Sequence, residues 1–255
     1  GGKPIFTNSS AEDGFKINIE DLKSKISSKT KFIIINSPNN PTGRVMSKEE
    51  LLQIADLARE NPNINILSDE IYELILKKEF KHYSLSSLAN DLKDRIFIIN
   101  GFAKGWAMTG WRIGYLVGPK DVIKASSALQ SQSTSNVCSF VQKGALEALK
   151  INNEFFSMIN SHYDQRRRLL YEGLNNINGI YIEEPNGAFY AFPKLPNSSI
   201  TSVDFCNKAL QDYGLVVVPG KAFGADQCIR ISCAASEIKI KDGLKRFEKA
   251  ISEYY

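Results

Sequence analysis

The stretch Lys31-Phe-Ile-Ile-Ile-Asn-Ser-Pro-Asn-Asn-Pro-Thr-Gly43 joins a β-branched apolar run to a segment dense in turn-forming residues. Its first half predicts a buried strand over residues 32–35, and its second half predicts a loop directly after that strand. Two further apolar runs have the same form. Residues 64–67 end at Ser68-Asp-Glu70, and residues 95–99 end at Asn100-Gly101. Each predicted strand therefore leads into polar residues.

Segments with helical spacing separate these runs. Ser47 and Glu50 have the spacing of a capping box ahead of an apolar face, which predicts a helix that begins there. Asn18 can cap a second helix, because it directly precedes another segment with an apolar face at helical spacing. Strands that alternate with helices indicate βαβ units, so we expect an α/β fold with a mainly parallel sheet. Residues 4–8 form one more strand-like run before the first helix.

Beyond residue 120 the pattern becomes largely helical, with a long helix-period segment over residues 153–177. Short strand-like runs and two more helical segments follow it. We expect a large domain over residues 1–160 and a smaller α+β domain over residues 161–255.

Composition excludes several classes of protein. The 255 residues are 43% hydrophobic and 24% charged, as in a globular chain that buries a core. A net charge of +4 does not predict a nucleic-acid partner, and the apolar runs are far shorter than the roughly 18 residues of a membrane span. Four cysteines without a C-x-x-C pair and only two histidines predict no metal site. Unpaired cysteines fit a reducing compartment, so we expect a cytoplasmic location.

Ligands of open parallel sheets bind at the carboxyl ends of the strands. Here those ends would carry an amide (Asn40), a carboxylate with a phenol (Asp69 and Tyr72) and an amine (Lys104). Each alone has an ordinary explanation: turn formation for Asn40, helix capping for Asp69, surface exposure for Lys104. Together at one edge of the sheet they predict a binding site.

A glycine-rich segment can be compared with two nucleotide-binding motifs. It reads Gly101-Phe-Ala-Lys-Gly-Trp-Ala-Met-Thr-Gly-Trp-Arg-Ile-Gly114. Its G-x-x-x-x-G is followed by Trp111-Arg112 instead of Lys-Ser/Thr, which excludes a P-loop, and the sequence has no G-x-G-x-x-G. A glycine-rich loop that lets the backbone approach a ligand remains, with Lys104 and Arg112 as its cations. Arg112 suits a phosphate group.

On these residues the chain resembles the class I and II aminotransferases, fold-type-I enzymes that use pyridoxal 5′-phosphate (PLP). It is most similar to their aspartate aminotransferase branch, which includes prephenate-using members. The resemblance runs over the whole chain and is highly specific in the order and spacing of its motifs. These motifs are residues 37–43, Ser68-Asp-Glu-Ile-Tyr72, Lys104 with Arg112 eight residues on, Met108-Thr-Gly-Trp-Arg-Ile-Gly-Tyr115 and Cys228-Ile-Arg-Ile-Ser232.

The resemblance implies a role for each cofactor residue. Lys104 would hold PLP as a Schiff base and then move a proton between the substrate and the cofactor. Asp69 would pair with the pyridinium nitrogen and keep it protonated. Asn40 and Tyr72 would donate hydrogen bonds to the ring O3′, and Arg112 would bind the phosphate.

The resemblance also implies substrate contacts. Arg230 would hold the substrate α-carboxylate as a bidentate fork, with Asn40 beside it. Alternatively, Arg230 is an ordinary exposed arginine at the rim of the protein. Its position between Ile229 and Ile231 does not distinguish the two interpretations.

The chain departs from the family pattern at two places. Gly101 stands where many members have a serine that helps to hold the phosphate. Members also have a substantial portion before the point where this chain starts, so we expect an N-terminally truncated member with an incomplete large domain.

The implied function is a PLP-dependent transaminase that moves an amino group between an amino acid, aspartate or glutamate, and a 2-oxo acid. Two alternatives stay open: a PLP-dependent β-eliminating lyase of the same fold, and a non-catalytic ligand-sensing domain. The resemblance implies a homodimer for the full-length protein.

Overall fold

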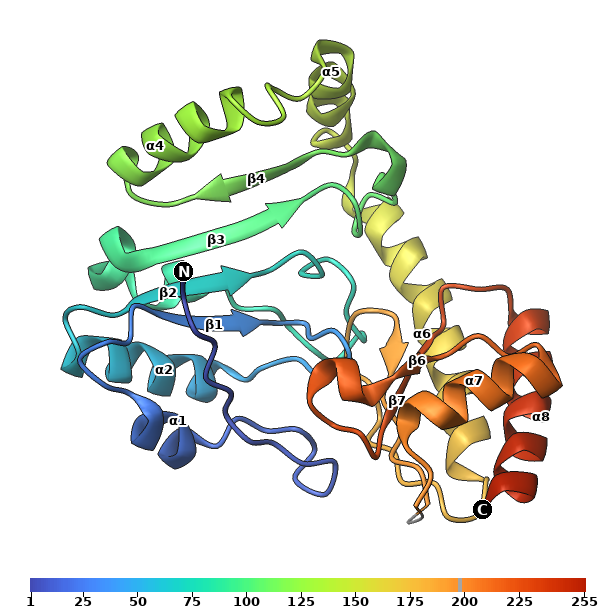
Figure 1. Cartoon of the computed structure of the whole chain (residues 1–255). Helices are drawn as coiled ribbons and strands as arrows, with labels where there is room; N and C mark the ends of the chain where they lie inside the picture. Colours follow the sequence, from blue (N-terminus) through green and yellow to red (C-terminus); the bar gives the residue numbers. More distant parts are fainter. Residues whose placement is uncertain (197–198) are drawn as a thin grey trace.

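The computed structural model describes residues 1–196 and 199–255 and is built around a four-stranded sheet (Figure 1). The strands lie in the order β1 (Phe32–Asn36), β2 (Asn65–Asp69), β3 (Ile96–Gly101) and β4 (Gly114–Val117). β1, β2 and β3 are parallel, and β4 is antiparallel to β3. The predicted α/β class with a mainly parallel sheet is confirmed.

The first helices pack against one face of this sheet. The helix α1 (Ile19–Lys25) is capped by Asn18, and α2 (Lys48–Glu60) begins with the predicted capping box of Ser47 and Glu50. Apolar residues of α2 join those of β1 to β3 in one buried cluster. The alternation along β1 buries Ile33 and Ile35 in this cluster and leaves Phe32 and Ile34 exposed on the opposite face.

Further helical segments connect and flank the strands. They are α3 (Leu85–Leu88), the 3₁₀ turns η1 (Asn90–Arg95) and η2 (Thr109–Trp111), α4 (Lys120–Ser131), α5 (Ser139–Ala148) and α6 (Asn153–Asn175). The long helix α6 leads from the end of the large sheet to the C-terminal part of the chain (Figure 1).

The C-terminal part has its own apolar core. A three-stranded antiparallel sheet has the order β5 (Tyr190–Ala191), β7 (Ile229–Ser232), β6 (Val218–Pro219). The helices α7 (Ser202–Tyr213) and α8 (Glu237–Tyr254), the 3₁₀ turn η3 (Gly220–Phe223) and the second half of α6 complete it. Phe205 and Phe247 pack edge to face inside it. The predicted domain boundary at residue 160 falls within α6 and stays a prediction.

One strand prediction was wrong, and one strand was missed. Residues 4–8 belong to the described chain but form no strand, and Ile5 and Phe6 are exposed there. β4 was not predicted, because its four residues directly follow a glycine-rich loop and have little apolar alternation. Within the described residues, no helix is both long enough and apolar enough to cross a membrane.

Candidate active site

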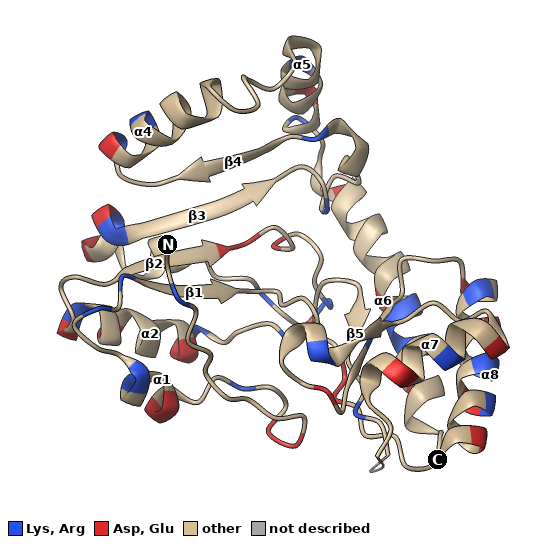
Figure 2. Ribbon diagram, viewed as in Figure 1, with Lys and Arg blue, Asp and Glu red and all other residues tan. Residues whose placement is uncertain are grey.

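The carboxyl ends of β1, β2 and β3 meet at one edge of the sheet. Asn36 pairs with Asp69, and Asp69 pairs with Ile99, so the loops that follow the three strands leave from neighbouring positions. Asp69 is the only charged residue in the four strands of this sheet, and it is the last residue of its strand. Figure 2 shows the acidic colour at this end of β2. A charge at that place indicates a ligand site.

The loop after β1 is held by its own asparagines. Asn36 Oδ1 accepts a hydrogen bond from Asn40 N at 2.8 Å, and Asn39 Oδ1 accepts one from Thr42 Oγ1 at 2.8 Å. Gly43 ends the loop with φ +71°, and a Cβ atom there would lie 2.7 Å from the carbonyl oxygen of Tyr190. Only glycine fits this turn, which fixes Asn40 against the C-terminal part of the chain.

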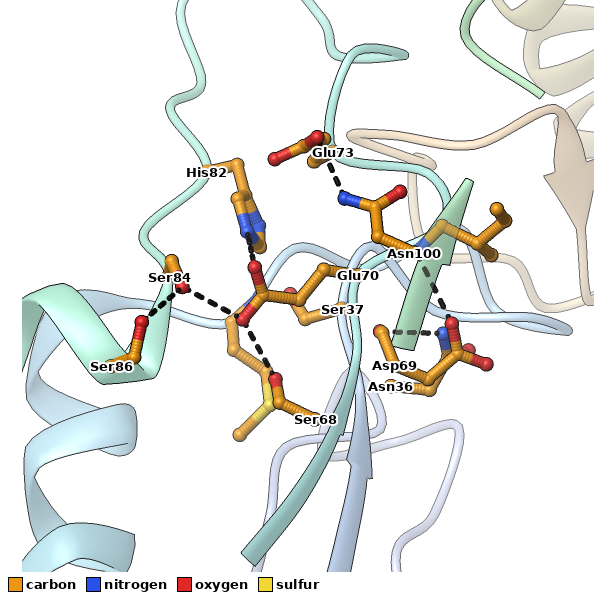
Figure 3. Close-up of polar contacts among 12 residues, drawn as sticks. Asn36, Ser37, Ser68, Asp69, Glu70, Glu73, His82, Ser84, Ser86 and Asn100 are labelled. Carbon is orange, nitrogen blue, oxygen red and sulfur yellow. Dashed lines mark hydrogen bonds and ion pairs between the residues drawn. The ribbon is translucent and has the colours of Figure 1, made fainter. Parts of the chain in front are cut away.

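Asp69 has no cationic partner among the residues that the structure describes. Its Oδ1 accepts a hydrogen bond from Ile71 N at 3.2 Å, and the Asn36 amide donates to its backbone carbonyl at 3.1 Å (Figure 3). Burial raises the pKa of Asp69, and the neighbouring Glu70 carboxylate raises it further. Among the described residues, no cation lowers this pKa. A positively charged ligand atom beside Asp69 would therefore be stabilised.

Lys104 lies beside a pair of aromatic rings, Tyr72 and Phe189, whose centroids are 5.5 Å apart. Its Nζ is 5.8 Å from the ring centroid of Tyr72 and 5.6 Å from that of Phe189. The Tyr72 hydroxyl lies 3.0 Å from the hydroxyl of Tyr190. Burial raises the pKa of Tyr72, and the Asp69 carboxylate acts on it in the same direction. The structure thus brings Lys104, Tyr72 and Asp69 into one neighbourhood.

Arg230 reaches this neighbourhood from β7. Its Nη1 donates to Asn40 Oδ1 at 2.9 Å, a contact between residues 190 positions apart. Its guanidinium carbon lies 4.7 Å from the ring centroid of Tyr190 and 5.2 Å from that of Phe223. The half-buried guanidinium is therefore oriented by two rings and one amide, with further N–H groups left to bind a ligand.

Arg112 is placed differently from the other predicted residues. It is exposed, has a left-handed backbone with φ +54°, and donates from Nη1 to the Thr109 carbonyl at 3.1 Å. The structure does not bring it into contact with the group around Tyr72. Its phosphate contact stays a prediction.

Gly101 has a steric reason to be glycine. It pairs with Gly114 of β4, and a Cβ atom at residue 101 would lie 2.7 Å from the Gly114 Cα. Paired backbones leave no room for the serine that many members of the resembled family have there.

Sequence reasoning missed three aromatic residues of the site: Phe189, Tyr190 and Phe223. The first two lie in the run Gly187-Ala-Phe-Tyr-Ala-Phe192, one of the short strand-like runs after residue 177, and adjacent aromatic residues are ordinary in a strand. No local signal marks Phe223. Its role depends on a contact with Arg230 that only the folded chain creates.

An α/β sheet whose strand ends gather a lysine, a carboxylate, a phenol and an amide defines a class of PLP enzymes. The chain belongs to the aminotransferase class I and II family, whose sequence model matches residues 1–247. It is 43% identical over 261 aligned residues to a protein named probable aspartate/prephenate aminotransferase of Rickettsia typhi, with 98% of this chain covered.

Solved structures show the same likeness. The aromatic aminotransferase from Pyrococcus horikoshii OT3 matches 100% of this chain and 68% of its own, with a TM-score of 0.94 and 36% identity. The match to the aspartate aminotransferase from Thermus thermophilus with maleate covers 95% of this chain and 62% of that enzyme's chain, with a TM-score of 0.88 and 39% identity. The chain spans 65% of the length of the Rickettsia typhi protein.

Proposed function

We propose that the protein is a transaminase that depends on pyridoxal 5′-phosphate. The observation that carries this proposal is the convergence of Lys104, Tyr72 and Asp69 at the carboxyl edge of the sheet, with Asn40 and Arg230 beside them. This set holds one group for each demand of the chemistry: an amine, an anion, hydrogen-bond donors and a carboxylate-binding cation.

The donor set fits PLP. The Asp69 carboxylate has no cationic partner among the described residues and would gain one from a protonated ring nitrogen. Asn40 uses its Oδ1 to accept from Arg230, which leaves its Nδ2 free to donate to a ring oxygen. When bound, PLP supplies an electron-withdrawing ring conjugated to the substrate nitrogen, which stabilises negative charge at the substrate α-carbon.

The chain's own residues hold and move protons around that ring. Asp69 would hold the ring nitrogen of bound PLP in its protonated form, because a buried carboxylate stabilises a neighbouring cation. Tyr72 stays protonated, since burial raises its pKa, and so its hydroxyl donates. With PLP bound, Lys104, which lies beside the Tyr72 and Phe189 rings, would be the group that takes the proton from the substrate α-carbon.

Arg230 orients the substrate for that proton transfer. One N–H of its guanidinium bonds Asn40, and the remaining donors bind the substrate α-carboxylate as a fork. The rings of Tyr190 and Phe223 flank the guanidinium and shield the ion pair from water. A carboxylate fixed at this point places the α-hydrogen toward Lys104.

We propose aspartate or glutamate as the amino donor and a 2-oxo acid as the acceptor. The names of the Rickettsia typhi protein and of the Thermus thermophilus enzyme with maleate support a dicarboxylic substrate. The Pyrococcus horikoshii enzyme is named an aromatic aminotransferase, so aromatic amino acids are the next candidates.

The test is turnover of the purified protein with aspartate and 2-oxoglutarate, measured as oxaloacetate and glutamate formed. Lys104→Ala should lower the rate at least about 1,000-fold, because it removes the covalent and acid–base group. Lys78→Ala, an exposed lysine, is the matched control and should keep the parent rate. Equal turnover by Lys104→Ala and the parent would refute the proposal.

Two alternatives have their own outcomes in the same assay. Pyruvate and ammonia released from a β-substituted amino acid, without a 2-oxo acid acceptor, would assign a β-eliminating lyase. Binding of PLP and an amino acid without any product would assign a ligand-sensing domain.

Further proposals concern the whole protein. We propose a homodimer, as the family resemblance implies, and exposed apolar residues such as Phe140 and Leu149 are available to a partner. Four free cysteines support a cytoplasmic location. We also place the domain boundary near residue 160, because Leu170 of α6 is buried in the C-terminal core.

A further inference from the structure

Beside Asp69 lies a cluster of polar side chains around the buried Glu70 that the proposed chemistry does not use (Figure 3). Glu70 is 2% exposed, and it accepts hydrogen bonds from Ser68 Oγ at 2.9 Å and Ser84 Oγ at 3.1 Å. His82 Nε2 lies 3.2 Å from its second carboxylate oxygen. Buried carboxylates are costly, and a fully bonded one fixes the segments that it joins. Glu70 thus anchors the loop that begins at Asp69.

A second link extends from this loop to the loop of Lys104. Asn100 is 4% exposed and donates from Nδ2 to Glu73 Oε1 at 2.7 Å. Its Oδ1 accepts from the backbone N–H of Gly101 at 2.7 Å. One amide therefore joins the segment after β2 to the last residue of β3, three positions before Lys104.

The bond between Glu73 and Asn100 lies where the loop after β2 and the loop after β3 leave the sheet. β2 and β3 are held in register only as far as Asp69 and Ile99, with one more bond from Glu70 N to the Ile99 carbonyl at 2.9 Å. Beyond that point the sheet ladder no longer positions the loops. Glu73 and Asn100 form the next bond between them, just before Lys104 leaves the sheet edge.

We propose that Glu73 and Asn100 are positioning residues, which fix the Lys104 loop relative to the loop that carries Asp69 and Tyr72. The inference rests on the proposed function, because the distance that they set is the one between the amine and the anion on either side of the cofactor. Neither residue touches the reacting atoms. Removal of the bond leaves Lys104 present but less well placed, which lowers turnover more than substrate affinity.

The variants separate the bond from the fold. Glu73→Ala removes the acceptor, and Asn100→Ala removes the whole link. Glu73→Gln keeps an oxygen that accepts from Asn100 and serves as the conservative rescue. Glu79→Ala changes an exposed glutamate in the same loop and is the matched control. Far-UV circular dichroism identifies any variant that fails to fold. Glu73→Ala and Asn100→Ala remove the same bond from opposite sides, so either one that folds carries the comparison with Glu73→Gln.

The first measurement is amide hydrogen exchange of residues 100–105 in the cofactor-free protein. Glu73→Ala and Asn100→Ala should exchange about fivefold faster or more, as expected for the loss of one hydrogen bond. Glu73→Gln and Glu79→Ala should match the parent. Unchanged exchange in both alanine variants would overturn the link, whatever the protein binds.

The second measurement is kcat and KM with PLP bound, together with the pH at which the visible absorbance of the bound cofactor changes. Both alanine variants should lose about 10- to 100-fold in kcat with a smaller change in KM, and the absorbance midpoint should move. Faster exchange with unchanged kcat and absorbance would overturn the positioning role alone. A parent protein that binds no PLP would instead refute the proposed function.

Discussion

Gly101→Ala tests how closely β3 and β4 approach beside the candidate site. The added Cβ would lie 2.7 Å from the Gly114 Cα and 2.9 Å from the Ile113 carbonyl oxygen. Carbon atoms in contact prefer about 3.5–4.0 Å, so the two backbones would have to separate by roughly 1 Å. No flexible side chain can yield, because both atoms belong to the backbone.

Two effects of opposite sign determine the size of the change. Overpacking of this kind costs about 1–3 kcal/mol of unfolding free energy. Alanine gains back roughly 0.5–1 kcal/mol over glycine in a strand, through the lower entropy of the unfolded chain. The net expectation is a loss of up to about 2.5 kcal/mol.

Gly110→Ala is the matched control, since its Cβ would have no atom within 4 Å and its φ is not in the left-handed region. Urea unfolding should give a lower midpoint with an unchanged slope for Gly101→Ala and an equal or higher midpoint for Gly110→Ala. A Gly101→Ala midpoint at or above that of Gly110→Ala would refute the close approach. Gly101→Ser adds the same Cβ and should lose a similar amount.

Three other predictions follow from single residues. Because burial raises the pKa of Asp69, this residue alone should destabilise the cofactor-free parent increasingly as pH rises from 3.8 through that raised value. The unfolding free energy of Asp69→Asn, measured with urea, should therefore rise relative to that of the parent as pH increases across that window. A difference in unfolding free energy between the two proteins that does not change with pH would contradict this. Arg230→Gln should raise KM for the 2-oxo acid by about 10- to 100-fold through loss of a charged hydrogen bond, whereas the exposed Arg168→Gln should leave KM unchanged. A thiol reagent should modify the exposed Cys138 rapidly in the native protein, because the other three cysteines are buried and burial raises the pKa of each; rapid labelling of Cys138→Ser would contradict this.

Much of the fold followed from local patterns. The parallel strands were predictable because each contains a short apolar run that ends in polar or turn-forming residues, and α2 was predictable from the capping box of Ser47 and Glu50. The prediction of a strand over residues 4–8 was wrong because an apolar run becomes a strand only where a neighbouring strand pairs with it. β4 was missed for the opposite reason: its pairing with β3 makes it a strand despite a weak local pattern.

The site was predictable where residues follow a strand. Asp69, Tyr72 and Lys104 lie close together because parallel strands carry their carboxyl ends to one edge. The bond between Asn40 and Arg230 was not predictable from spacing, since it joins residues from the two ends of the chain. The link between Glu73 and Asn100 was equally hidden, because an acidic residue in a loop gives no sign that it will accept a hydrogen bond from a buried amide.

The central claim is that Lys104 holds the cofactor opposite Asp69. The most direct measurement is to incubate the protein with PLP, reduce it with borohydride and map the modified lysine by mass spectrometry. The account predicts one stable pyridoxyl group, on Lys104, and none in Lys104→Ala. Labelling spread over exposed lysines, or the same extent of labelling in Lys104→Ala, would contradict it.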